Sequence, residues 1–210
     1  MKINPAPLHL AQVAVTSLIV ALSIAVLGTS AHTLDVFNKQ QTSNPWWLPL
    51  WPQHFDVGGT KALVGTSTTV LIFSSVFLAV SLVPFFNIAN KHTMRALLGL
   101  GTTLPTMLLT LVTVIYVHIQ NKGSPELDTI QTWTCKYKNS QSLQQLDDLD
   151  VMGNENFGSL CREGQFALYG TLTVFLLLSA SMGLTIVTWM ADKWVSRQAR
   201  KEVEMANQQS

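Results

Sequence analysis

The two cysteines, Cys135 and Cys161, are the residues whose type and spacing most clearly allow chemistry. They could form a disulfide, remain two free thiols or act as a redox pair. Redox and metal motifs usually place cysteines about two residues apart with partners nearby, whereas these two are far apart and the chain has no other cysteine. We therefore expect a structural disulfide, which would close a loop of about 27 residues and stabilise the fold by roughly 3.5 kcal/mol in the chain-entropy model.

Four histidines near the ends of apolar stretches raise the question of haem binding. His9 and His92 lie at one end of two such stretches, and His32 and His118 lie at the other. If these stretches are helices, His9 and His32 lie about 34 Å apart, and His92 and His118 lie about 39 Å apart. Both distances exceed the roughly 30 Å hydrocarbon core of a membrane. Axial ligands of a buried haem lie well inside the core, so we expect interfacial histidines and no cofactor. A membrane haem electron carrier is kept as a remote alternative.

Metal and enzyme motifs are missing from the sequence. Asp147, Asp148 and Asp150 lack the alternating ligands and the glycine of a calcium loop, so they are interpreted as a solvated helix face and no metal site is predicted. The chain contains no Gly-x-Ser-x-Gly, His-Glu-x-x-His, phosphate-loop or dinucleotide-binding pattern. We therefore expect no enzyme activity and name no catalytic residue.

A segment from Asn44 to Asp56 combines three tryptophans with three prolines, so it cannot be regular helix or central strand. It can be interpreted as an interfacial lid packed over helix ends, or as a recognition surface for a partner, a lipid or a glycan. The two interpretations are compatible. The candidate contact residues are Trp46, Trp47, Trp51, His54 and Phe55.

The elements that must position these residues are long apolar stretches. The chain has 210 residues, of which 12% are charged, and four stretches free of Asp, Glu, Lys and Arg are each long enough to cross a bilayer. Helices are expected because every backbone amide in hydrocarbon needs an internal partner. The fold class predicted is an all-α four-helix transmembrane bundle, a single membrane domain over residues 1–210 with spans at about 10–30, 62–86, 96–118 and 166–191.

The distribution of basic residues predicts the orientation of these spans. The N-terminus, the turn at 90–95 and the tail at 192–210 hold seven basic residues and three acidic ones in short segments, which indicates the cytosolic side. Outer loops are then expected at 31–61 and 119–165, the second closed by the disulfide. The first span is interpreted as an uncleaved signal-anchor, because its apolar stretch is longer than that of a signal peptide. Residues expected to touch anionic lipid are Lys193, Arg197, Arg200 and Lys201.

The order of these features resembles known four-span families. Four spans, a short cytosolic turn, a tryptophan-bearing first outer loop and an outer cysteine pair are similar to MARVEL, claudin-like and tetraspanin proteins, and the stretch from Trp46 to Asp56 resembles uncharacterised fungal membrane proteins. The chain lacks the Gly-Leu-Trp and first-loop cysteines of claudins and the Cys-Cys-Gly of tetraspanins. Occludin-type MARVEL proteins, with cysteines in the second outer loop, fit better. That resemblance implies membrane organisation, junction or trafficking work and no catalysis.

The function expected from the sequence is therefore that of a non-enzymatic organiser or adaptor in the plasma membrane or an endomembrane. Its partners would be the lipid bilayer, other membrane proteins or a second copy of the chain, and no nucleic acid. Small residues at four-residue spacing, such as Ser179 with Gly183 and Gly65 with Thr69, are interpreted as packing within the bundle or as a self-association face. A passive channel or carrier for a small neutral solute is the alternative, since no charge lies within the spans.

Overall fold

The protein is a bundle of four long helices with a small structured region at one end. The computed structural model describes residues 6–42, 51, 55–82, 92–124, 127–139 and 156–208. The long helices are α1 (Ala6–Thr42), α2 (Gly58–Leu82), α3 (His92–Lys122) and α5 (Phe157–Gln208). Between α3 and α5 lies a short helix, α4 (Ile130–Tyr137), and two short strands, β1 (Phe55–Asp56) and β2 (Asp128–Thr129), pair in parallel.

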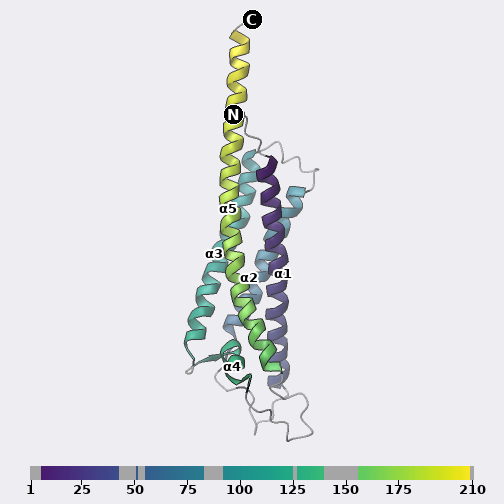
Figure 1. Cartoon of the computed structure of the whole chain (residues 1–210), viewed down its shortest axis with the longest axis vertical. Helices are drawn as coiled ribbons and strands as arrows, with labels where there is room; N and C mark the ends of the chain where they lie inside the picture. The colour runs from purple at the N-terminus through teal and green to yellow at the C-terminus, as the bar shows by residue number, and fades with distance from the viewer. Residues whose placement is uncertain are drawn as a thin grey trace.

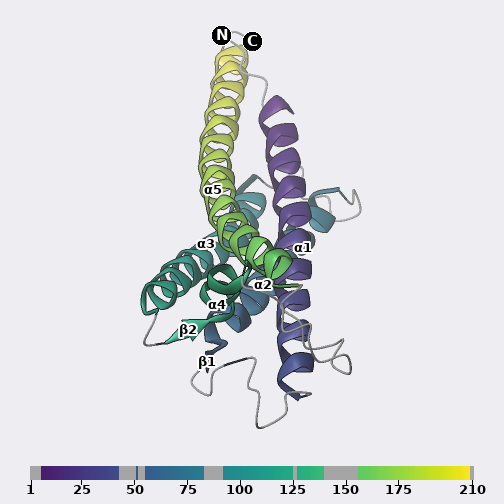
Figure 2. The same cartoon turned by 60° about the horizontal axis from the view of Figure 1, so that its bottom comes forward.

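The long helices pack in a ring. Helix α1 contacts α2 and α5, and α3 contacts the same two helices from the opposite side (Figure 1). The described chain begins and finishes at the same end of the bundle, which we call the tail end, and α5 extends there far beyond the other helices. At the opposite end, the cap end, α4 lies against α5, and the strands lie beside it (Figure 2). The fold is therefore the predicted all-α four-helix bundle.

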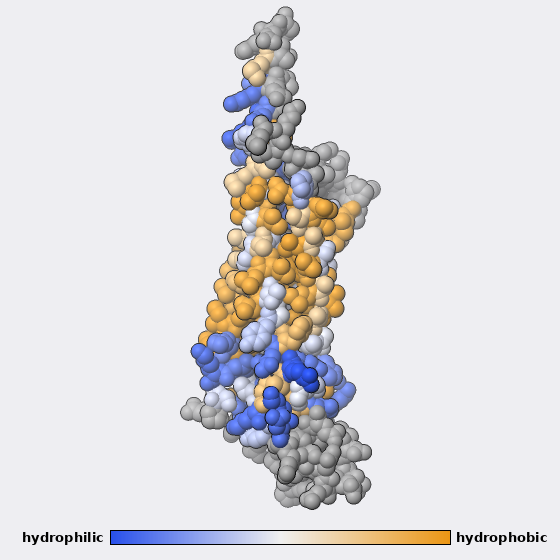
Figure 3. Space-filling model, viewed as in Figure 1, coloured by the Kyte–Doolittle hydropathy of each residue, from blue (hydrophilic) through white to orange (hydrophobic). Residues whose placement is uncertain are grey.

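The surface of the bundle is that of an integral membrane protein. All four long helices are long and apolar enough to cross a membrane. On the face shown in Figure 3, a broad apolar band covers the bundle between hydrophilic surfaces at the cap and on the tail. Together the four helices and the band define the class of this protein: a multi-pass membrane protein whose described ends lie on one side.

The helices are longer than the predicted spans. Residues 31–42, expected in a loop, continue α1 to Thr42, and the tail continues α5 to Gln208. At 1.5 Å per residue the 52 residues of α5 extend about 78 Å, more than twice the hydrocarbon thickness. Residues 31–42 are helical because Thr33, Phe37 and Gln40 are buried at the cap end, where their packing supports the last turns of α1.

Buried positions follow a heptad pattern. In α1, α3 and α5 buried residues recur at alternating steps of four and three, the spacing of left-handed helix packing. Hydroxyl side chains occupy many of these positions. This is common in membranes, because the hydrophobic effect does not drive helices together in lipid and small side chains let the helices pack closely. The series in α3 is Gly99, Thr103, Thr106, Thr110, Thr113 and Val117, and that in α5 is Ala167, Thr171, Val174, Leu178, Ser181, Thr185, Thr188 and Asp192.

Most of these hydroxyls are satisfied within their own helix. Thr110, for example, donates to the carbonyl oxygen of Thr106 at 3.0 Å. Some hydrogen bonds also join helices, among them Thr66 to Thr113 at 2.7 Å and Gln12 Nε2 to Thr185 Oγ1 at 2.8 Å. The buried hydroxyls therefore serve helix packing first, and their presence alone does not require a pore.

A glycine pair in α5 tests this close packing. A Cβ added at the buried Gly170 would lie 2.7 Å from Val26 Cγ2 of α1, whereas one added at the exposed Gly183 would meet nothing within 4 Å. Gly170→Ala is expected to lower the free energy of unfolding by about 1–3 kcal/mol through overpacking. Gly183→Ala is the matched control and should raise it by up to about 1 kcal/mol through helix propensity. Thermal unfolding in detergent measures both, and equal effects would contradict the packing described.

Candidate functional site

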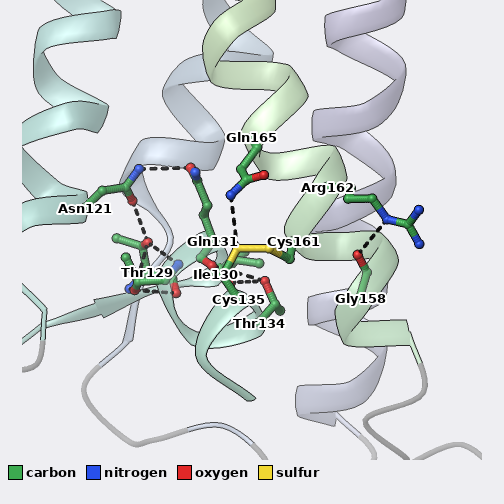
Figure 4. The surroundings of a disulfide bond; sticks show 11 residues. Asn121, Thr129, Ile130, Gln131, Thr134, Cys135, Gly158, Cys161, Arg162 and Gln165 are labelled. Carbon is green, nitrogen blue, oxygen red and sulfur yellow. Dashed lines mark hydrogen bonds between the residues drawn. A yellow bond between two sulfur atoms is a disulfide. The ribbon is translucent and has the colours of Figure 1, made fainter. Parts of the chain in front are cut away.

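The candidate site is the cap, the structured region formed by the last turns of α1, Trp51, both strands, α4 and the first turns of α5. Its central covalent link is the disulfide between Cys135 of α4 and Cys161 of α5. The predicted bond is thus confirmed. Figure 4 shows it between the two helices, with Gln165 Nε2 directed at Cys135 Sγ, 3.9 Å away. The bond fixes α4 on the surface of α5. Helix α4 lies outside the apolar band, and the bond limits its movement relative to the bundle.

Hydrogen bonds position the beginning of α4. Thr129 caps the helix, because its side chain accepts from Thr132 N and the Thr132 hydroxyl accepts from Thr129 N. Asn121, at the end of α3, accepts from Thr129 Oγ1 at 2.7 Å and donates to Gln131 Oε1 at 2.9 Å (Figure 4). Helix α4 was not predicted from the sequence, although the pair Thr129 and Thr132 is a variant of a capping box. Its signal is weak because α4 has only eight residues.

The strand pairing connects two distant parts of the chain. Phe55 pairs with Asp128 and Asp56 with Thr129, so the segment before α2 lies beside the segment before α4. The Asp56 carboxylate accepts from Gly58 N at 2.6 Å, at the start of α2, and also from Gln120 Nε2. The predicted first and second outer loops therefore meet in one structure.

An aromatic cluster fills the interior of the cap. Trp51 is 3% exposed, and its ring centre lies 4.9 Å from that of Phe37, 5.1 Å from Phe55 and 5.3 Å from Phe157. Its Nε1 donates to the buried Gln40 Oε1 at 3.2 Å. Trp51 has the position that the lid interpretation expects, and its ring is not free to touch a partner. Phe55 is partly buried in the same cluster.

The other three predicted contact residues of this segment, Trp46, Trp47 and His54, lie outside the described residues. So do the aspartates at 147, 148 and 150.

The tail end has a second polar cluster, on the side of the bundle opposite the cap. His9 Nε2 lies 3.8 Å from Asp192 Oδ2, and Asp192 is only 5% exposed. Arg95, Gln12 and Asp192 line one small cavity there. From the sequence, Arg95 and Asp192 were placed just outside the spans and counted only in the charge balance that predicts the orientation. Because helix packing continues beyond the predicted spans, these two charges face each other within the end of the bundle.

The basic residues of the tail lie on an exposed helix. Lys193, Arg197 and Lys201 are exposed at four-residue spacing on α5, and Lys193 Nζ lies 4.8 Å from the ring centre of Trp189. The side chain of Arg200 lies outside the described part of the chain. The helical form of this tail agrees with an extension of the fourth span.

His32 and His118 have ordinary surroundings. His32 Nδ1 lies 2.8 Å from Glu163 Oε2 at the cap, and His118 is exposed on α3. Within the described ranges no group of three or more His, Cys, Asp or Glu side chains could hold a metal ion.

Two glycines interpreted as packing residues point outward. Gly65 and Gly183 are exposed, and a Cβ added at either would meet nothing within 4 Å. The interpretation as packing within the bundle is therefore wrong for these two residues, because their faces are turned away from the neighbouring helices. Close approaches between helices occur at other glycines, among them Gly59, Gly99 and Gly170.

Comparison with known proteins finds no family model, no curated protein and no solved structure that matches this chain. Its class is therefore defined by its own structure: an integral membrane protein with a four-helix bundle and a disulfide-linked cap.

Proposed function

We propose that this protein is a non-catalytic organiser or adaptor of the membrane, which makes its specific contacts through the cap. The observation that carries the proposal is the cross-linking of the cap: one disulfide, one strand pairing and one aromatic cluster hold together segments from four parts of the chain. A surface fixed in advance loses little conformational entropy on binding. The resemblance to occludin-type MARVEL proteins suggests the same kind of work.

In this proposal the cap lies on the outer or lumenal side, and both termini lie in the cytosol. A disulfide is stable in an oxidising compartment and rare in the cytosol. The exposed basic stripe of Lys193, Arg197 and Lys201 suits the anionic cytosolic leaflet, where each such charge contributes about 1 kcal/mol. The outward faces at Gly65 and Gly183 offer places where a helix of a partner or of a second copy could approach.

The alternative of a passive channel has less support. The described cavities within the bundle have volumes of about 20, 10 and 10 Å³. Two apolar layers of buried side chains lie along the axis, each at most 4% exposed. They consist of Ile19, Val70, Val174 and Leu178, and of Val26, Leu63, Val117 and Ala167. A solute larger than water has no room in these spaces.

Charge reversal on the cap tests the proposal. Lys136, Lys138 and Arg162 are exposed cap residues, so changing all three to Glu should leave the fold intact. Association with the partner, measured by cross-linking in intact membranes and quantitative mass spectrometry, should fall by about tenfold, since like charges at an interface cost over 1 kcal/mol. The matched control reverses Lys193, Arg197 and Lys201 and should keep the partner. Loss with the control variant alone would assign the contact to the tail and contradict the proposal.

A further inference from the structure

A small cavity of about 20 Å³ lies between the bundle and the cap. Its walls come from all four long helices and from the segment that begins α4. The lining residues that matter here are Ser30, Leu63, Val117, Gln120, Thr129 and Gln131. None of the described lining residues carries a charge, so the cavity suits an uncharged molecule.

Two polar atoms of these lining residues are buried without a hydrogen-bond partner in the described structure. Ser30 is 1% exposed and its Oγ has no partner. Gln120 uses its Nε2 to donate to Asp56 Oδ2 and Tyr116 OH, but its Oε1 is buried and accepts nothing. Unpaired buried polar atoms are costly, and in known structures they are usually satisfied by ordered water.

The size of the cavity selects the ligand. One water needs about 10–15 Å³ of such space, so this cavity holds one and excludes anything much larger. The ligand must donate a hydrogen bond to Gln120 Oε1 and exchange one with the Ser30 hydroxyl. We propose that the cavity is a binding site for a single water molecule that bridges Ser30 of α1 and Gln120 of α3.

The walls explain why this water would be retained. On the tail side, Val26, Leu63, Val117 and Ala167 form a buried apolar layer. On the cap side, Thr129 and Gln131 lie over the cavity, in the segment that the disulfide fixes on α5. The bound water therefore links α1 to α3 at the cap end of the bundle, next to the segment that begins α4.

Ser23 provides a matched control on the same helix. It is also 1% exposed and its Oγ also has no partner, but it lines none of the three described cavities. If Ser30 binds water, Ser30→Ala removes satisfied hydrogen bonds and destabilises the protein. If its hydroxyl is unsatisfied, the same change removes a buried unpaired group and leaves stability unchanged or higher.

The test uses the full-length protein in lipid nanodiscs. Ser30→Ala should lower the melting temperature by about 2–4 °C, whereas Ser23→Ala should leave it unchanged or raise it. In hydroxyl-radical footprinting with pulsed X-rays, where bound water is the probe, Leu63 and Val117 should be labelled rapidly in the wild type and slowly in Ser30→Ala. The proposal is overturned if Ser30→Ala is at least as stable as Ser23→Ala, or if neither residue is labelled in the wild type.

Discussion

Replacing Trp51 by alanine is expected to lower the free energy of unfolding by about 3–5 kcal/mol, the usual cost of removing a buried aromatic ring. The ring is 3% exposed and contacts the rings of Phe37, Phe55 and Phe157. Its loss would also leave Gln40 Oε1 without its donor. Thermal or denaturant unfolding in mild detergent, followed by tryptophan fluorescence and circular dichroism, measures the effect.

Two further variants make this prediction specific. Trp51→Phe keeps an aromatic ring but removes the hydrogen bond to Gln40, so it should cost only about 1–3 kcal/mol. Trp194→Ala removes a ring that is 42% exposed at the tail end, and it should change stability by less than about 1 kcal/mol. If Trp51→Ala were as stable as Trp194→Ala, the lid interpretation would be wrong, and Trp51 would be free to contact a partner.

Removing the disulfide is the second change with a large expected effect. Cys135 and Cys161 close a loop of about 27 residues, so the double variant Cys135→Ser with Cys161→Ser should lose roughly 3.5 kcal/mol of stability. For a chain of this length that corresponds to a fall of about 7–14 °C in the melting temperature. Because the four long helices do not depend on the bond, circular dichroism at low temperature should still show a helical protein.

The reduced wild type is the control for this variant. It should melt at the same temperature as the double serine variant, since both lack the same cross-link. A double variant as stable as the oxidised wild type would show that the cap is held by its noncovalent contacts alone, and would remove the disulfide from the account.

The sequence predicted the bundle because its physical signal is strong. Four long stretches without charged residues have only one stable state in a membrane, the helix, and the structure has four such helices. The disulfide followed from the number of cysteines and their distance along the chain. The buried face of α3 could also have been predicted from the sequence, because the buried residues Thr103, Thr106 and Thr110 follow a heptad spacing. A search for apolar residues overlooks it, since those positions carry hydroxyls.

The cap could be predicted only in part, because tertiary contacts form it. The pairing of Phe55 and Asp56 with Asp128 and Thr129 joins segments far apart in the chain, and a strand of two residues has no periodicity. The tryptophan segment allowed both a lid and a contact surface, and only the packing of Trp51 distinguishes them for that residue. The outward positions of Gly65 and Gly183 likewise depend on how each helix is rotated, which spacing alone does not determine.

Thiol labelling in sealed vesicles whose cytosolic face is outward tests the proposed topology of the cap and the tail. The protein would carry the substitution Met205→Cys, at a tail position that is 59% exposed, and a membrane-impermeant maleimide would be the reagent. The thiol introduced at position 205 should be labelled at once, and Cys135 and Cys161 should be labelled only after the vesicles are opened and the disulfide is reduced. Labelling of Cys135 or Cys161 in sealed vesicles, or protection of position 205, would contradict the proposed topology.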